Sequence, residues 1–230
     1  MAFAFKPCSI ININTMAEVK NGIMGAFTGK VGPVSGYTRY NRNIMRTAHS
    51  RVNDKSTPKR EAQREKVRVC NRFINAFSGI GIFSRTFPDP NHGGSGYNRA
   101  MRVLMNSALK GEYPHYEISY EKFLISKGEL PAPENAAVTL DEAGNFIFTW
   151  TNNTTDGTAK ANDNAVLVAY FPGSQRQLAY ALNAADRAAC TATLEIPIEN
   201  KGAVAETWLS FVSNDGHIAA NSVYTGRLEV

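Results

Sequence analysis

The chain has 230 residues, of which 43% are hydrophobic and 20% are charged. This composition excludes a globally disordered chain, and no apolar run approaches the roughly 18 residues of a membrane-spanning helix. The cysteines Cys8, Cys70 and Cys190 are far apart and odd in number, which excludes a disulfide scaffold and a CxxC metal site.

The net charge of +5 is unevenly distributed along the chain. Residues 1–130 contain 20 Lys and Arg against 9 Asp and Glu, whereas residues 131–230 contain 5 against 11. Pro131-Ala-Pro133 between these halves is typical of a stiff linker. We therefore predict a basic domain at 22–130 and an acidic domain at 131–230.

The N-terminal residues predict neither export nor membrane insertion. Met1–Cys8 lacks a basic leader and an apolar stretch of about 7 to 15 residues. We expect a cytoplasmic or virion-associated protein with no membrane partner. Residues 1–21 are predicted to form an N-terminal arm, of which 1–15 precede a second plausible start at Met16.

Five glycines lie between residues 22 and 36, and Gly29 precedes Lys30. A phosphate-binding Walker loop needs four residues between its glycines and a Ser or Thr after the Lys. Gly25 and Gly29 have three residues between them, and Val31 follows Lys30. We therefore expect the glycines to let an irregular or extended segment turn and pack closely.

Basic residues outnumber acidic ones by 12 to 3 between Lys30 and Arg72. Within Tyr37–Arg46, Tyr and Arg alternate in a way that suits stacking on bases and contact with phosphates. An exposed hairpin explains the same alternation. The candidate residues for binding a polyanion or an acidic partner are Lys30, Arg39, Tyr40, Arg42, Arg46, Arg60, Arg64, Arg68 and Arg72.

Two helices are expected in the basic half. Thr57-Pro58 predicts the start of the first, with Thr57 as its cap and Pro58 at the first helical position. Cys70 falls in its apolar stripe, while the four arginines from Arg60 to Arg72 recur every fourth residue on another face. That row is either a solvated face or a surface that follows a phosphate backbone or an acidic partner. The second helix is expected from about Ser95 to Lys110, with Gly111 ending it.

The acidic half shows short apolar alternations separated by turn signals. Seven short strands without a helix signal predict an antiparallel β-sandwich of the immunoglobulin or fibronectin type III kind, and hence an α+β protein of two domains. We expect Trp150 and Trp208 to anchor the core between its two sheets. The predicted strands are Ala137–Leu140, Asn145–Thr151, Ala165–Phe171, Arg176–Ala181, Ala189–Ile196, Ala203–Ser213 and Ile218–Arg227.

Catalytic and metal-binding patterns are absent from the sequence. No Ser-His-Asp set, paired-carboxylate pattern or HExxH motif can be drawn. Asp141, Glu142, Asp156 and Asp163 do not form an EF-hand loop and are expected to be scattered surface acids. We predict no catalytic residue, no metal and no cofactor, and hence a protein that is not an enzyme.

Several stretches together resemble an uncharacterised bacterial family of unknown function, and the resemblance covers nearly everything from Met16 onward. The family has no established activity, so the resemblance implies nothing catalytic. The stretches that carry it are Asn21-Gly-Ile-Met-Gly-Ala-Phe-Thr-Gly-Lys-Val-Gly32, Arg46 through Thr57-Pro58 to Gln63-Arg64, Leu130-Pro-Ala-Pro-Glu-Asn135, Phe148-Thr-Trp-Thr151, Ser213-Asn-Asp-Gly216 and Asn221-Ser-Val-Tyr224.

A looser resemblance links residues 22–80 to uncharacterised bacteriophage structural proteins. The strand around Trp150 is separately similar to fibronectin-type domains, which mainly serve as binding or spacing modules. We therefore expect a structural or assembly protein that binds protein partners or its own copies. The alternative is a nucleic-acid-binding protein that uses the Arg-rich segment 39–72 together with Tyr37.

Overall fold

A computed structural model describes residues 18–19, 25–39, 41–47, 56–77, 79, 81–88 and 94–230. The chain divides into two compact units, Met1–Lys55 and Ser56–Val230, which are described separately below. The protein is a mixed α+β protein with several antiparallel sheets, none of them closed. The predicted domains at 22–130 and 131–230 remain a prediction; the contacts divide the chain at a different position.

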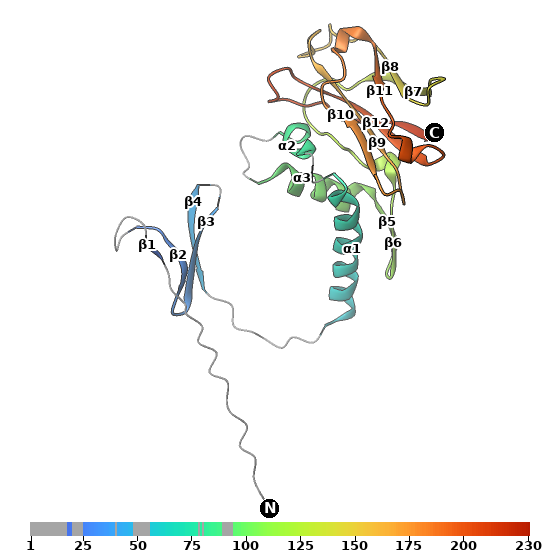
Figure 1. The fold of residues 1–230 in the computed structure, drawn as a ribbon. Coiled ribbons are helices and arrows are strands. Elements are labelled where there is room, and N and C mark those ends of the chain that lie inside the picture. Colours follow the sequence, from blue (N-terminus) through green and yellow to red (C-terminus); the bar gives the residue numbers. More distant parts are fainter. Residues whose placement is uncertain are drawn as a thin grey trace, which may run out of the picture. The chain divides into compact units, whose positions relative to one another are not determined.

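The first unit contains a sheet of four strands in sequential order. Its strands are β1 (Glu18–Val19), β2 (Phe27–Val31), β3 (Val34–Arg39) and β4 (Arg42–Thr47) (Figure 1). The exposed hairpin, one of the two interpretations of Tyr37–Arg46, is formed by β3 and β4; its register pairs Arg39 with Arg42 on the same face, whereas simple alternation along one strand predicted opposite faces. The described part of the glycine-rich segment is mainly extended, since β2 and β3 pair across a tight turn. A Cβ on Gly36 would lie 2.4 Å from the carbonyl oxygen of Phe27, so only glycine allows this close approach.

The second unit begins with the helices α1 (Pro58–Asn75), α2 (Ile82–Thr86) and α3 (Gly96–Val103), the last continuing as a π-helix, η2 (Leu104–Ala108). The predicted start of α1 is confirmed, with Pro58 in the first turn. Thr57 does not cap it through its side chain; instead its carbonyl accepts a hydrogen bond from the Glu61 amide at 3.0 Å. Ser95 does cap α3, because its hydroxyl accepts a hydrogen bond from the Asn98 amide.

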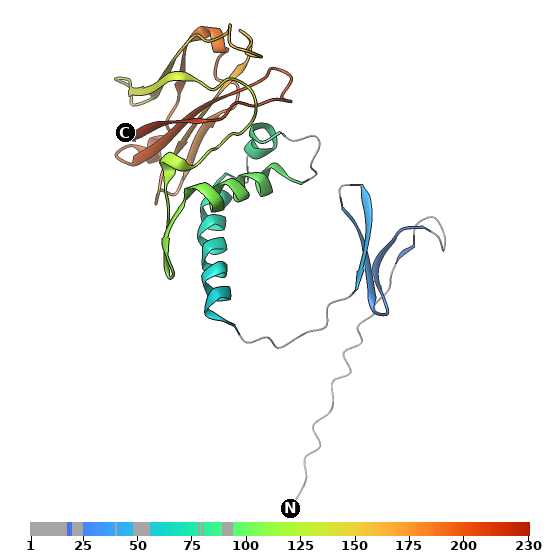
Figure 2. The same ribbon diagram turned by 180° about the vertical axis from the view of Figure 1, so that it is seen from behind.

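The predicted end of the second helix at Gly111 is wrong. The helix stops at Ala108, and Gly111 lies inside β5 (Leu109–Glu112), which pairs with β6 (His115–Ile118). Gly111 is needed there because its φ is +89° and a Cβ would lie 2.3 Å from the His115 carbonyl oxygen. This β5–β6 hairpin lies alongside α1 in both views (Figures 1 and 2).

The seven strands predicted after residue 131 are all confirmed, each within a few residues of its expected limits. They form a four-stranded sheet of order β10-β9-β12-β13 and a three-stranded sheet of order β11-β8-β7. The strands are β7 (Glu134–Leu140), β8 (Phe146–Thr151), β9 (Asn164–Tyr170), β10 (Leu178–Ala181), β11 (Thr191–Leu194), β12 (Val204–Val212) and β13 (Val223–Glu229).

The central strands β9 and β12 of the four-stranded sheet are buried on both faces, and each face belongs to a different hydrophobic core. The helix-side core joins α1, η2 and the segment after β6 to one face of this sheet, and the sheet core joins the other face to the three-stranded sheet. The helix-side core includes Cys70, Phe73, Ile74, Phe77, Leu104, Phe123, Ile125, Val166, Val168, Tyr170 and Trp208. The sheet core includes Phe146, Phe148, Trp150, Ala165, Leu167, Ala169, Phe171, Leu194, Leu209 and Phe211.

These two cores separate the two tryptophans. Trp150 anchors the sheet core as predicted, with its ring 5.6 Å from that of Phe211. Trp208 does not, because it points to the opposite face, where its indole N–H donates to the Phe123 carbonyl at 3.1 Å. The burial predicted for Cys70 in the apolar stripe of α1 is confirmed.

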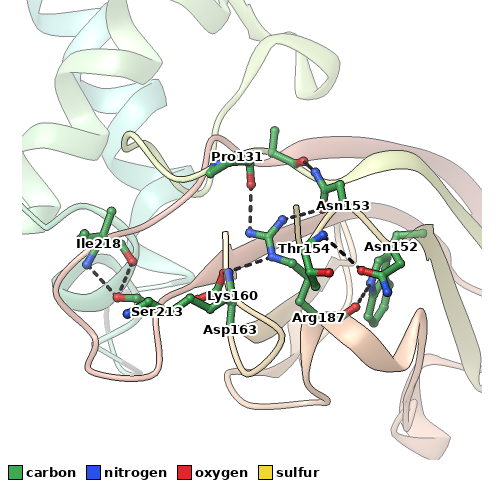
Figure 3. A network of polar contacts seen from close by, with 11 residues as sticks. Pro131, Asn152, Asn153, Thr154, Lys160, Asp163, Arg187, Ser213 and Ile218 are labelled. Carbon is green, nitrogen blue, oxygen red and sulfur yellow. Dashed lines mark hydrogen bonds and ion pairs between the residues drawn. The ribbon is translucent and has the colours of Figure 1, made fainter. Parts of the chain in front are cut away.

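A buried polar network connects Pro131 to the sheets that follow it (Figure 3). Its centre is Arg187, the first residue of the short helix η4 (Arg187–Ala189). The Arg187 guanidinium donates hydrogen bonds to Asp163, to Asn153 and to the carbonyl of Pro131. Asp163 is therefore not the surface acid expected from the sequence; it is 1% exposed because it forms an ion pair with Arg187.

Candidate functional site

The register of the first sheet brings its basic side chains together. Paired residues on adjacent strands share a face, and so do alternate residues along a strand. Lys30 pairs with Ser35, and Ser35 pairs with Arg46, so these three residues share one face. Arg39 lies four residues after Ser35 on β3 and pairs with Arg42, so both arginines lie on that face too. All four described cations of this sheet therefore lie on one side. We call this side the basic face and define it by Lys30, Tyr37, Arg39, Arg42, Ile44 and Arg46.

The basic face concentrates positive charge on a small surface. Arg39 and Arg42 stand directly opposite one another on paired strands, where like charges repel. The four cationic residues are exposed, and the Arg46 guanidinium lies 5.5 Å from the centroid of the Tyr37 ring. A surface of this kind gains energy when an acidic group approaches it.

The opposite face of the same sheet is apolar and thinly covered. It carries Phe27 over Gly36, together with Val31, Val34 and Met45. Val31 is 53% exposed and Met45 is 68% exposed. Among the described residues of this sheet, Gly36 alone is buried, so the sheet has almost no core of its own.

The remaining predicted binding residues lie elsewhere. Tyr40 lies outside the described residues. The predicted row of arginines is confirmed as exposed on α1, in the second unit, where Arg68 forms an ion pair with Glu65 and Arg64 donates to Ser56 at 3.3 Å. Arg72, the last of the row, lines a pocket.

This pocket, of about 690 Å³, lies in the second unit between α1, the β5–β6 hairpin and the strands β9, β12 and β13. The Lys66 ammonium lies 5.3 Å from the centroid of the Tyr116 ring and so joins the hairpin to α1. We call it the tyrosine pocket, after the four tyrosines in its lining: Tyr116, Tyr120, Tyr170 and Tyr224.

A buried carboxylate stands among these tyrosines. Glu206 is 4% exposed, and its Oε2 accepts a hydrogen bond of 2.5 Å from the Tyr224 hydroxyl. Its Oε1 lies 3.9 Å from Nε of Arg227, which is beyond hydrogen-bond distance. Burial, followed by the charges of Tyr170 and Glu206, raises the pKa of Tyr120 to about 12. Burial and the hydrogen bond to Glu206 also raise the pKa of Tyr224.

The sequence interpretation missed the tyrosine pocket. Its residues come from α1, β6, the short helix η3 (Tyr120–Lys122), β9, β12 and β13, so no spacing in the chain connects them. The one available signal was the stretch Asn221-Ser-Val-Tyr224, which belongs to the family resemblance and contains Tyr224.

Metal-ligand clusters and membrane-spanning helices are absent from the described part of the chain. No three His, Cys, Asp or Glu side chains within it are grouped so as to hold a metal ion. The helices of these ranges also include none with the length and apolar character needed to cross a membrane.

The fold and these two sites define a mixed α+β protein with a one-sided basic sheet and a separate polar pocket. The chain belongs to the family of unknown function DUF6266, which matches residues 22–226. The predicted resemblance to a family of unknown function is thereby confirmed. No curated protein matches the chain.

Proposed function

We propose that the protein is a non-enzymatic structural or assembly protein that binds an acidic protein surface through its basic face. Its specific role in this proposal is that of a component of a bacteriophage-type particle. The sheets after residue 131 form an immunoglobulin- or fibronectin-like sandwich that presents or spaces a binding surface.

The basic face is the observation that carries this proposal. Four cations lie on one side of a small sheet, with Arg39 directly opposite Arg42, and this local excess of positive charge complements an acidic protein surface. The sheet also lacks a core of its own, so contact with a partner supplies burial that its described strands do not supply themselves.

The arrangement of the second unit supports a scaffolding role. Side chains from the three-stranded and four-stranded sheets share the sheet core, where Phe146 stacks on Phe171 and Trp150 meets Phe211 edge-on. Rings from two antiparallel sheets that meet in one core are typical of sandwich domains. The looser resemblance to phage structural proteins covers residues 22–80 and so includes both the basic face and α1.

A second copy of the chain is the partner that the charge distribution favours. Residues 131–230 carry 11 acidic against 5 basic residues, which complements the basic face of another molecule. Contact between two different surfaces of identical chains produces head-to-tail assembly. Because the surfaces are exposed and charged, the association is expected to weaken as salt screens them.

Sedimentation of the purified chain across a salt series tests this proposal. We expect larger species at low salt, and we expect the double variant Arg39→Gln/Arg42→Gln to lose them. The control Arg102→Gln/Arg176→Gln removes the same charge from exposed positions outside the basic face and should still assemble. A monomer at every concentration and ionic strength would exclude self-assembly, and equal behaviour of the two variants would exclude the basic face.

A nucleic-acid-binding protein is the second candidate, and the pairing of Arg46 with Tyr37 favours it. An aromatic ring and guanidinium groups on one face of a sheet form a surface on which bases stack and phosphates bind. In that case, the affinity for single-stranded DNA or RNA should fall steeply with salt and should weaken in Arg39→Gln/Arg42→Gln and in Arg64→Ala/Arg68→Ala. Fluorescence anisotropy that shows no binding at low salt would exclude this function.

A further inference from the structure

The charges that line the tyrosine pocket balance. The lining includes three basic residues, Arg72, Lys110 and Arg227, and three acidic ones, Glu117, Glu121 and Glu206. Lys110 and Glu117 already form an exposed ion pair at 3.6 Å. An anion in this pocket would meet the buried carboxylate of Glu206, and a cation would meet Arg72 and Arg227. The charge balance therefore favours a neutral ligand.

A hydrogen-bond acceptor and a donor lie side by side in the pocket. Oε1 of Glu206 and Nε of Arg227 form a long ion pair at 3.9 Å, which is too far for a direct hydrogen bond and close enough for each group to serve one of two adjacent ligand groups. A pair of neighbouring hydroxyls matches this spacing, because one can donate to the carboxylate while the other accepts from the guanidinium.

The tyrosines of the pocket add further groups that can form hydrogen bonds with hydroxyls. The hydroxyls of Tyr120 and Tyr170 make no hydrogen bond with other described residues, and both line the pocket. Burial raises the pKa of each, so both remain protonated around neutral pH and can donate as well as accept. Tyr116 adds an aromatic surface held against α1 by Lys66.

From this arrangement we propose that the tyrosine pocket binds a neutral, hydroxyl-rich ligand, namely a mono- or oligosaccharide. A sugar ring offers vicinal hydroxyls to Glu206 and Arg227, further hydroxyls to Tyr120 and Tyr170, and an apolar C–H face to the tyrosine rings. The volume of about 690 Å³ falls within the range of roughly 300 to 1,000 Å³ typical of small-molecule sites.

Saturation-transfer NMR with the full-length protein tests this site. The probes are glucose, galactose, mannose, N-acetylglucosamine, cellobiose and maltose at millimolar concentration, with methyl phosphate and ethylguanidinium as charged probes whose C–H protons the method detects. We expect transfer to at least one sugar and to neither charged probe. Titration of that sugar should show affinity about tenfold weaker in Glu206→Gln and in Arg227→Gln, since each loses a hydrogen bond to a charged group.

Two matched variants serve as controls. Glu195→Gln and Arg176→Gln make the same changes at exposed positions outside the pocket and should bind like the wild type. The Arg227 side chain is 67% exposed, so Arg227→Gln keeps the fold even if Glu206→Gln does not. The proposal is wrong if no sugar in the panel binds, if a charged probe binds in place of the sugars, or if sugar binding is the same in Arg227→Gln as in Arg176→Gln. It does not depend on the basic face, whose variants lie in the other unit.

Discussion

Arg187 and Asp163 form an ion pair that is almost completely removed from solvent, with Nε 3.1 Å from Oδ2 and exposures of 0% and 1%. The guanidinium also donates to Asn153 at 2.7 Å and to the Pro131 carbonyl at 3.0 Å, and lies 3.9 Å from the centroid of the Phe211 ring (Figure 3). Pro131 is therefore joined to the sheets by a buried charge, and the proline segment is part of the packed structure.

The two partners of this pair should not contribute independently to the stability of the second unit. Arg187→Met leaves Asp163 buried without a counter-charge, which should lower the free energy of unfolding by about 3 to 5 kcal/mol. The double variant Arg187→Met/Asp163→Leu should cost less than the sum of the two single changes. Urea unfolding of the four proteins measures this coupling, and additive losses would mean that the pair does not act as a unit.

Gly96 should not tolerate a side chain. A Cβ at this position would lie 1.8 Å from the Phe83 carbonyl oxygen, so α2 and α3 could not keep their present contact. We expect Gly96→Ala to lower the free energy of unfolding by about 1 to 3 kcal/mol, as overpacking typically does. Gly79→Ala is the matched control, because its Cβ meets nothing within 4 Å. Equal thermal unfolding of the two variants would contradict this prediction.

Substituting each of the two tryptophans should increase amide hydrogen exchange in a different part of the second unit. Trp208→Phe removes the indole N–H that donates to Phe123, and so should increase amide exchange in α1 and the β5–β6 hairpin. Trp150→Phe removes the donor to the Arg187 carbonyl, and so should increase exchange in β8 and β11. Native-state hydrogen exchange distinguishes these patterns. The same amides responding to both variants would argue against two separate cores.

The tyrosines of the pocket should make stability fall at alkaline pH. Burial raises the pKa of Tyr120 from 10.0 to about 12, so the folded state retains a proton that the unfolded state releases. The resulting stabilisation is fully present below pH 10 and is lost as the pH rises through 12. Tyr120→Phe should reduce the loss of unfolding free energy over this interval. Urea unfolding at several alkaline pH values measures this loss of unfolding free energy. An unchanged pH dependence in Tyr120→Phe would exclude Tyr120 as a source of the loss.

Local patterns predicted much of the secondary structure. Pro58 is suited to the first turn of a helix, and the strands after residue 131 alternate between apolar and polar residues or are bounded by turn signals. The end of the second helix was not predictable in the same way. Gly111 is a plausible helix stop, but its left-handed φ is used inside a hairpin that pairs with a later segment.

The two cores could not be predicted because β9 is apolar on both faces. Val166 and Leu167 are equally hydrophobic neighbours, yet one packs toward the helices and the other toward the three-stranded sheet. Periodicity identifies a buried strand of this kind but does not show which layer covers each face. For the same reason Trp208 was expected in the wrong core.

The sequence by itself determined the charge asymmetry, the family, the strands after residue 131 and the start of α1, because each depends on composition or on neighbours along the chain. Only the tertiary structure decided which charges act together. The register of three short strands gathers Lys30, Arg39, Arg42 and Arg46 on one face, and the antiparallel pairing of β12 with β13 brings Glu206 beside Tyr224 and Arg227. Both arrangements depend on contacts between residues far apart in the chain, which spacing alone does not encode.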